Sequence, residues 1–356
     1  MMTVSVAFAI YRLPYEKHVT LVQQMEGEPM ELVSCTDLNG KSGFVVAPFE
    51  VRQDQPILLI RPDRVETFPV EDIPSLSLHV TTTSTGILGG HRMHYSIDFA
   101  NDHSQLELRT FRKIVLARCS DEEVQEPLSP IVLFHKACEL YPRMFISLVN
   151  TAKSGCWLTA TPEILLEGGG KTPWRTIALA GTMQLEGEQL NSEGENLSWS
   201  TKNIQEQRYV ATYIVECLEQ FTRDIHEEGP FTVRAANLVH LRSDFTFSLS
   251  DGQHIGDLLQ ALHPTPAVCG LPKREAFQFI VRNEYTPRRY YSGFMGMLDP
   301  ECLTHLYVSL RCMNIEPSRY HLYAGGGLLK DSTEEQEWQE TEAKLETMRR
   351  LLDKRS

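Results

Sequence analysis

Residues 323–345, YAGGGLLKDSTEEQEWQETEAKL, contain the signals around which the rest of the chain is organised. A short apolar run leads into three glycines at 325–327, and an acidic segment with helical character follows. Glycine lets a backbone approach a ligand closely and adopt a positive φ without a steric penalty. This order predicts a strand, a loop and a helix that together form one wall of a site.

The helical repeat gives the predicted C-terminal helix two distinct faces. Glu337, Glu340 and Lys344 share one face. A second face, suited to packing against a core, contains Trp338, Thr341, Leu345, Met348 and Leu352. Two carboxylates three residues apart repel each other, and a divalent cation between them removes the repulsion. The alternative is an acidic face that is simply solvated.

Composition narrows the class of protein. The chain has 356 residues, 42% of them hydrophobic and 23% charged, which is typical of a soluble globular protein of one large or two average domains. A net charge of −13 argues against a nucleic-acid surface. Eight scattered cysteines without zinc-ligand spacing suggest free thiols in a reducing compartment. With no leader-like segment and no apolar run of membrane-spanning length, we expect a cytoplasmic protein that does not associate with membranes.

Strands dominate the first part of the chain, residues 1–104. Short apolar runs bounded by turn residues predict strands within 4–14, 18–24, 43–49, 56–62 and 76–82. We expect a connecting stretch over 86–104.

The second part, residues 105–356, mixes strands and helices. Its patterns predict helices over 105–118, 131–141, 200–221, 255–262 and 274–282. Strands are predicted over 144–150, 155–162, 164–169, 231–241, 290–298, 306–312 and 320–327. Grouped strands without regular βαβ alternation predict an α+β fold, in which large antiparallel sheets form a layered core with helices packed outside. We expect the two parts to form one integrated domain.

Two glycine-rich stretches invite comparison with nucleotide-binding motifs. The run 168–172, GGGKT, resembles the end of a phosphate-binding loop, but position 165 is Leu where that motif requires glycine. The glycines at 325–327 do not complete a dinucleotide motif, because position 330 is Lys. We therefore expect a hairpin turn at 168–172 and no dinucleotide site.

Further charged residues suggest a metal site and an acid–base pair. Lys202 and Glu206 lie one turn apart on a predicted helix, where a surface ion pair is the simplest interpretation. If that helix lies beside the C-terminal one, Glu206 joins its two carboxylates in a magnesium site. Lys113 adjoins an apolar run, so it is either a buried general base or a side chain that reaches solvent. Glu163, at a strand end, could be a proton donor or a solvated turn residue.

Several ordered blocks together resemble the chorismate-utilising enzymes. They are FRKIVLAR (111–118), GCWLTATPEILLE (155–167), IALAGT (177–182), STKNIQEQ (200–207), VHLRS (239–243), ALHPTPAVCGLP (261–272), NEYTPRRYYSG (283–293), VSLR (308–311) and the stretch 323–345. The resemblance covers about residues 105–350 and implies the fold of that family. The N-terminal part is similar, less specifically, to menaquinone-pathway isochorismate synthases.

The resemblance also implies a chemistry. In the family's isochorismate and salicylate enzymes, a lysine at the position of Lys113 activates water for attack at C2 of chorismate. A glutamate at the position of Glu163 protonates the departing C4 hydroxyl. Ammonia-using relatives typically carry Gln at the first position, and aminodeoxychorismate synthases carry Lys at the position of Ala180. Salicylate synthases tend to carry Thr at the position of Ala267, which favours release of isochorismate here.

Residue by residue, the resemblance assigns a binding site for metal and substrate. Glu206, Glu337 and Glu340 would hold Mg²⁺, which binds the ring carboxylate of chorismate. The enolpyruvyl carboxylate and the rest of the pocket would involve Arg311, Tyr291, Gly325, Lys344, His240, Thr182 and Gly181. Two departures, Asn203 for a common acidic residue and Gln207 for a common His, put the surroundings of the metal in doubt.

Together these features predict a Mg²⁺-dependent isochorismate synthase that feeds menaquinone synthesis and needs no obligatory protein partner. A salicylate synthase and an anthranilate synthase-like component are the alternatives within the family. A module that binds an anionic metabolite without catalysis is the alternative outside enzymology.

Overall fold

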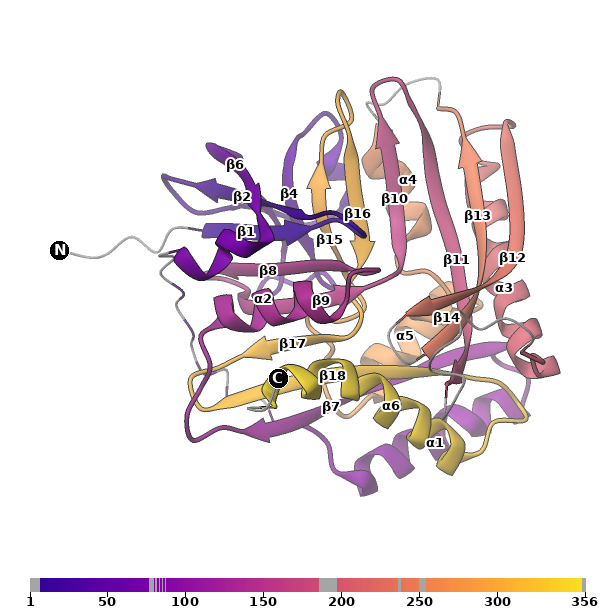
Figure 1. The fold of residues 1–356 in the computed structure, drawn as a ribbon. Helices are drawn as coiled ribbons and strands as arrows, with labels where there is room; N and C mark the ends of the chain where they lie inside the picture. The colour runs from indigo at the N-terminus through magenta and orange to yellow at the C-terminus, as the bar shows by residue number, and fades with distance from the viewer. Residues whose placement is uncertain are drawn as a thin grey trace.

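The computed structural model describes residues 7–76, 80, 82, 84, 86, 88–185, 197–235, 238–249 and 254–353. Two nine-stranded antiparallel sheets form its centre, and their strands run across each other in the view of Figure 1. The first sheet has the order β14 (Gly270–Leu271), β7 (Lys113–Glu123), β18 (Arg319–Leu328), β17 (Cys312–Ile315), β9 (Gly155–Thr161), β8 (Phe145–Thr151), β1 (Ala7–Arg12), β2 (His18–Gln24) and β6 (Arg64–Pro69). The second has the order β12 (Ile225–Ala235), β13 (Leu238–Phe247), β11 (Thr172–Gln184), β10 (Ile164–Gly169), β16 (Thr304–Val308), β15 (Phe294–Leu298), β4 (Gly43–Ala47), β5 (Ile57–Ile60) and β3 (Met30–Leu32).

Helices cover the outer faces of both sheets, as the α+β prediction requires. Their bounds are α1 (Arg92–Glu107), α2 (Pro130–Leu140), α3 (Thr201–Leu218), α4 (Ile255–Leu262), α5 (Lys273–Asn283) and α6 (Glu334–Leu352), with 3₁₀ turns η1 (Cys35–Leu38) and η2 (Val70–Ser75). One apolar cluster joins α2 and α6 to the first sheet, and another joins α3 and α4 to the second. Between the sheets, aromatic side chains such as Phe145 and Tyr307 stack with ring centroids 4.3 Å apart. Both faces of the central strands are therefore buried, which explains their continuous apolar runs.

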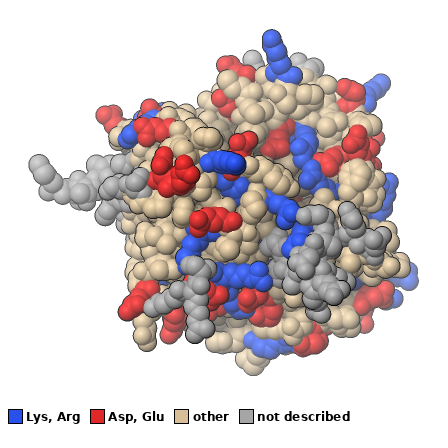
Figure 2. Space-filling view, in the orientation of Figure 1, with Lys and Arg blue, Asp and Glu red and all other residues tan. Residues whose placement is uncertain are grey.

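Both parts of the chain contribute to both sheets. In the first sheet β1 pairs with β8, and in the second β4 pairs with β15. None of the helices among the described residues is long and apolar enough to cross a membrane. On the face shown in Figure 2, acidic and basic side chains are interspersed.

Two predicted elements are wrong around residues 86–118. The stretch expected to be a connection contains α1, in which Tyr95, Phe99 and Leu106 are buried, whereas the apolar Met93 and Ile97 are exposed. The helix expected over 105–118 is not formed, because Lys113 begins the long strand β7. The apolar run after Lys113 pairs with the glycine-rich end of β18, so long-range pairing overrides the local helical pattern.

Other predictions need smaller corrections. The region 231–241 spans parts of two paired strands, β12 and β13, and 306–312 is divided between β16 and β17. The run 168–172 is the turn between β10 and β11, as predicted. The strand expected over 76–82 lies largely outside the described residues, and β1 begins at Ala7 after residues that are not described.

Candidate active site

At two of the places where the chain crosses from one sheet to the other, the crossing supplies a charged side chain. Between β9 and β10 the crossing carries Glu163, and between β16 and β17 it carries Arg311. Backbone hydrogen bonds join the two crossings. Val308 N donates to the Glu163 carbonyl at 2.9 Å, and Ala160 N donates to the Arg311 carbonyl at 3.1 Å. Arg311 adopts a φ of 45°, in the left-handed region. The topology thus places both side chains between the sheets.

A narrow cavity of about 60 Å³ lies at these crossings. The predicted site residues that line it are Glu163, Gly181, Thr182, Glu206, His240, Ala267, Tyr291, Arg311, Gly325 and Lys344. Those not among its lining residues are Lys113, Glu337 and Glu340, which lie behind the glycines of β18. Residues that the sequence did not suggest include Val115, Leu179, Val268 and Leu310, which supply apolar walls. Most of the predicted residues are therefore brought to one cavity.

Glu163 is buried, with 3% of its surface exposed, so it is not a solvated turn residue. Burial raises its pKa to about 8, and Lys113, Arg311 and Lys344 oppose that rise without cancelling it. The side chain therefore holds a proton at neutral pH. A protonated carboxyl group that faces a cavity is suited to act as a general acid.

Lys113 is fully buried, so it does not reach solvent along its apolar neighbours. Its Nζ lies 3.0 Å from Oε1 of Glu206 on α3. Burial disfavours the charged carboxylate of Glu206, but Lys113 and then Lys202 outweigh burial and lower its pKa. Of the two residues predicted to form a surface ion pair, Glu206 is buried and pairs with Lys113, whereas Lys202 pairs with Glu337.

Arg311 and His240 both line the cavity and form a hydrogen-bonded pair. Nη2 of Arg311 contacts Nε2 of His240, and Nδ1 of His240 lies 3.1 Å from the carbonyl oxygen of Gly181. Burial, followed by the charges of Arg311 and Lys344, lowers the pKa of His240 far below its ordinary value. The ring is therefore neutral, with Nδ1–H donating to Gly181 and Nε2 accepting from Arg311. This leaves the remaining donors of Arg311 available for an anion in the cavity.

The glycines of β18 let three carboxylates approach the backbone. A Cβ on Gly327 would lie 2.0 Å from Oε1 of Glu206. A Cβ on Gly326 would lie 3.2 Å from Oε2 of Glu337 and 3.8 Å from Oε1 of Glu340. The end of β18 thus lies against carboxylates from both α3 and α6, and the ion pair of Lys202 with Glu337 joins the two helices.

Each of these three carboxylates forms an ion pair with a lysine. Lys113 pairs with Glu206 and Lys202 with Glu337, and Lys344 Nζ donates to Oε1 of Glu340 at 2.7 Å. Burial disfavours the charged ammonium of Lys202, but the surrounding carboxylates, led by Glu337, outweigh it and raise its pKa.

The residues present fit a hard divalent cation such as Mg²⁺. All three donors are carboxylates, and Oε2 of the buried Glu337 has no hydrogen-bond partner among the described residues. Burial, followed by Glu340, raises the pKa of Glu337. As placed, the three carboxylates do not bring their ligand atoms within 4.8 Å of one another, so they would have to draw together around an ion.

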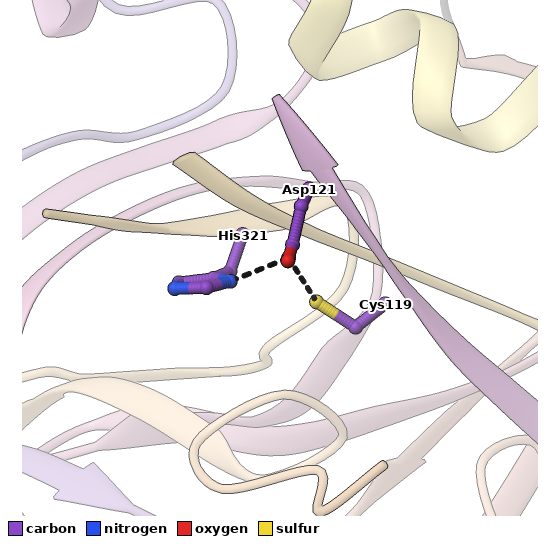
Figure 3. Close-up of side chains that lie close together, drawn as sticks. All are labelled: Cys119, Asp121 and His321. Carbon is purple, nitrogen blue, oxygen red and sulfur yellow. Dashed lines mark hydrogen bonds and ion pairs between the residues drawn. The ribbon is translucent and has the colours of Figure 1, made fainter. Parts of the chain in front are cut away.

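A different group does place three ligand atoms within 4.8 Å of one another, Cys119, Asp121 and His321 (Figure 3). Asp121 Oδ1 lies 2.7 Å from His321 Nδ1 and 3.9 Å from Cys119 Sγ. Its other oxygen accepts from Gly89 N at 2.9 Å. These contacts join β7 to β18, in which Asp121 and His321 lie opposite each other.

Hydrogen bonds also fix the groups around this cavity. Lys344 Nζ donates to the carbonyl oxygen of Gly325 at 2.8 Å, and a Cβ on Gly325 would lie 2.8 Å from the Tyr291 hydroxyl. Gln207, which replaces a common His, donates to Ser243 Oγ at 2.9 Å. Asn203 lies against Gly181, where a Cβ would be 3.0 Å from the Asn203 carbonyl.

A buried ion pair that the sequence did not suggest braces β7, the strand that begins with Lys113. Arg288 forms a bidentate pair with Glu284 at 2.6 and 2.7 Å and donates to the carbonyls of Val115 and Val268. Glu284 in turn accepts from Ala117 N at 2.8 Å. The pair connects β7, which begins with Lys113, to the cavity wall at Val268. The two residues are four positions apart in the sequence, a spacing that is also typical of surface ion pairs on helices. Only the fold shows that this pair is buried and connects β7 to the cavity wall.

Comparison with known proteins identifies the family. A family model described as "Chorismate binding enzyme" matches residues 88–353. The chain belongs to this family. Among curated relatives, the salicylate biosynthesis isochorismate synthase of Pseudomonas aeruginosa is 34% identical over 251 residues, and isochorismate synthase MenF of Escherichia coli is 33% identical over 242 residues. These matches cover 68% and 67% of this chain but only 51% and 56% of the relatives.

The fold is shared with solved structures over almost its whole length. A putative 2,3-dihydroxybenzoate-specific isochorismate synthase, DhbC, from Bacillus anthracis superposes with a TM-score of 0.82. The match covers 99% of this chain and 97% of that one at 23% sequence identity. The layered α+β architecture is thus confirmed as that of a chorismate-binding enzyme.

Proposed function

We propose that this protein is a Mg²⁺-dependent isochorismate synthase, which converts chorismate to isochorismate. The observation that carries the proposal is the pairing of two buried groups, Lys113 and a Glu163 that retains its proton at neutral pH. A protein that only bound an anionic metabolite would have no use for such a pair. The names of the related enzymes support the same reaction.

In the proposed reaction, Lys113 acts as the base that takes a proton from a water molecule as that water attacks C2 of chorismate. The ring double bonds shift, and Glu163 gives its proton to the C4 hydroxyl, which leaves as water. Arg311 and Lys344 bind the carboxylates of the substrate, and the apolar walls exclude other water. Mg²⁺ held by Glu206, Glu337 and Glu340 would supply positive charge for the ring carboxylate.

Alternatives within the family differ in the nucleophile or in a later step. An anthranilate synthase-like component would use ammonia, and Lys113 in place of Gln argues against it. A salicylate synthase would go on to eliminate pyruvate, and Ala267 in the cavity wall, where such enzymes tend to carry Thr, argues against that. We assign the product to menaquinone synthesis on the N-terminal resemblance. The eight free cysteines support a reducing, cytoplasmic location.

The direct test is to incubate the purified protein with chorismate and Mg²⁺, without an ammonia source, and to identify products by chromatography and mass spectrometry. Isochorismate in equilibrium with chorismate is the expected result. Salicylate with pyruvate would identify the second reaction instead. An aminated product that appears only with ammonia would show that Lys113 does not activate water.

A further inference from the structure

Lys202 lies at the centre of the carboxylate cluster, although neither substrate binding nor proton transfer requires it. It is one turn before Glu206 on α3, and its Nζ pairs with Oε1 of Glu337 on α6. It also interacts electrostatically with Glu340 and Glu206. One ammonium group therefore faces all three carboxylates that would bind a metal ion.

The three lysines of the cluster differ in how firmly they are held. Lys113 is fully buried, and Lys344 is anchored by a second bond to the Gly325 carbonyl. Among the contacts described for it, Lys202 has one hydrogen bond, to Glu337, and 27% of its side chain is exposed. Lys202 is thus the lysine that can withdraw toward solvent without breaking a second contact.

We propose that Lys202 is a tethered cation that occupies the carboxylate cluster when the metal ion is absent and competes with Mg²⁺ for it. In this role Lys202 sets the metal affinity of the site and keeps the buried carboxylates neutralised between metal-binding events. The inference rests on the metal-ligand set of the proposed function, but not on the identity of the reaction.

The proposal predicts the direction in which metal affinity changes. A positive charge among the ligands repels a divalent cation and holds Glu337 in an ion pair that must break, so removing that charge strengthens binding. If Lys202 served only to orient Glu337 for metal binding, removing it would weaken Mg²⁺ binding. The sign of the change separates the two roles.

The experiment is calorimetric titration of Mg²⁺ into the full-length protein without chorismate. We expect Lys202→Met to bind Mg²⁺ about tenfold more tightly than the unaltered protein, or more. Lys202→Arg, which retains the charge, should not bind more tightly. Arg208→Met removes an exposed cation from the same helix, paired with Glu227, and should leave the affinity unchanged.

Thermal unfolding gives a second readout that depends on neither turnover nor heats of binding. Without metal, Lys202→Met should unfold at a lower temperature, because Glu337 loses its partner, and added Mg²⁺ should raise that temperature more than in the unaltered protein.

Unchanged or weaker Mg²⁺ binding by Lys202→Met would overturn the inference while leaving the metal site in place. Absence of Mg²⁺ binding in every variant would overturn both the ligand set and the inference. Tighter binding by Lys202→Met in a protein that makes no isochorismate would support the inference and contradict the reaction.

Discussion

At the scale of single residues, the reaction depends on Lys113 and on Glu163, whose burial raises its pKa to about 8. Glu163 needs its proton, and Glu163→Gln cannot donate one. We expect kcat to fall about 100- to 10,000-fold, the usual contribution of a general acid, with little change in KM for chorismate. Initial-rate kinetics would measure both constants. A variant with normal kcat would rule out Glu163 as the acid.

The pKa of Glu163 also predicts a pH dependence. Because that pKa is raised to about 8, the acid is protonated below pH 8 and loses its proton above it. We expect kcat/KM to fall as pH rises through about 8, and this limb of the profile reports the free enzyme. A profile that stays flat to pH 9.5 or so would contradict the assignment of the acid.

Lys113→Gln tests the proposed general base. The variant lacks the base, so it should form no isochorismate, whereas Glu206 remains available for metal. Mg²⁺ binding measured by calorimetry should therefore persist. Normal turnover by Lys113→Gln would exclude the proposed role of this lysine.

At the scale of elements, the end of β18 must remain free of side chains. In Gly327→Ala the new Cβ would lie 2.0 Å from Glu206 Oε1, so the carboxylate must move away. We expect Mg²⁺ binding and turnover to be lost while the far-ultraviolet circular dichroism is retained.

Gly40→Ala is the matched control for that substitution. A Cβ on Gly40 meets nothing within 4 Å, and only its positive φ of 67° costs about 1–2 kcal/mol. It should keep full activity. Equal Mg²⁺ binding by Gly327→Ala and Gly40→Ala would show that β18 does not shape the metal site.

The sequence predicted the helix α6 and the strand before it, because their signals are local and strong, although the three glycines expected to form a loop belong to β18 itself. It failed at β7, where Lys113 and its apolar neighbours read as a helix end. The pairing of β7 with the end of β18, some 210 residues later, decides that segment, and local patterns contain no information on such pairing. The polar helix α1 was missed for the opposite reason, since only a few of its residues face the core.

The site shows the same division between local and long-range information. The structure brings most of the residues that the resemblance assigned to the substrate site to one cavity. Lys113 pairs with Glu206, and Lys202 pairs with Glu337, because of the way in which α3, α6 and β7 meet. The sequence alone places Lys202 and Glu206 one turn apart, so it suggests a local pair between these two residues instead.

At the scale of the whole molecule, the buried Glu284–Arg288 pair connects β7 to the cavity wall. Arg288→Met would leave Glu284 charged without its partner in a dry environment, which typically destabilises a protein by about 3–5 kcal/mol. Denaturant unfolding would measure that loss. An unchanged midpoint would mean that the pair adds nothing to the rigidity of the site.

The central claim is that water adds at C2 as the C4 hydroxyl leaves, and turnover in ¹⁸O-labelled water tests it most directly. We predict isochorismate with one labelled oxygen, located at C2, and no isochorismate when Lys113→Gln is used. Isochorismate that carries no solvent oxygen would contradict the account.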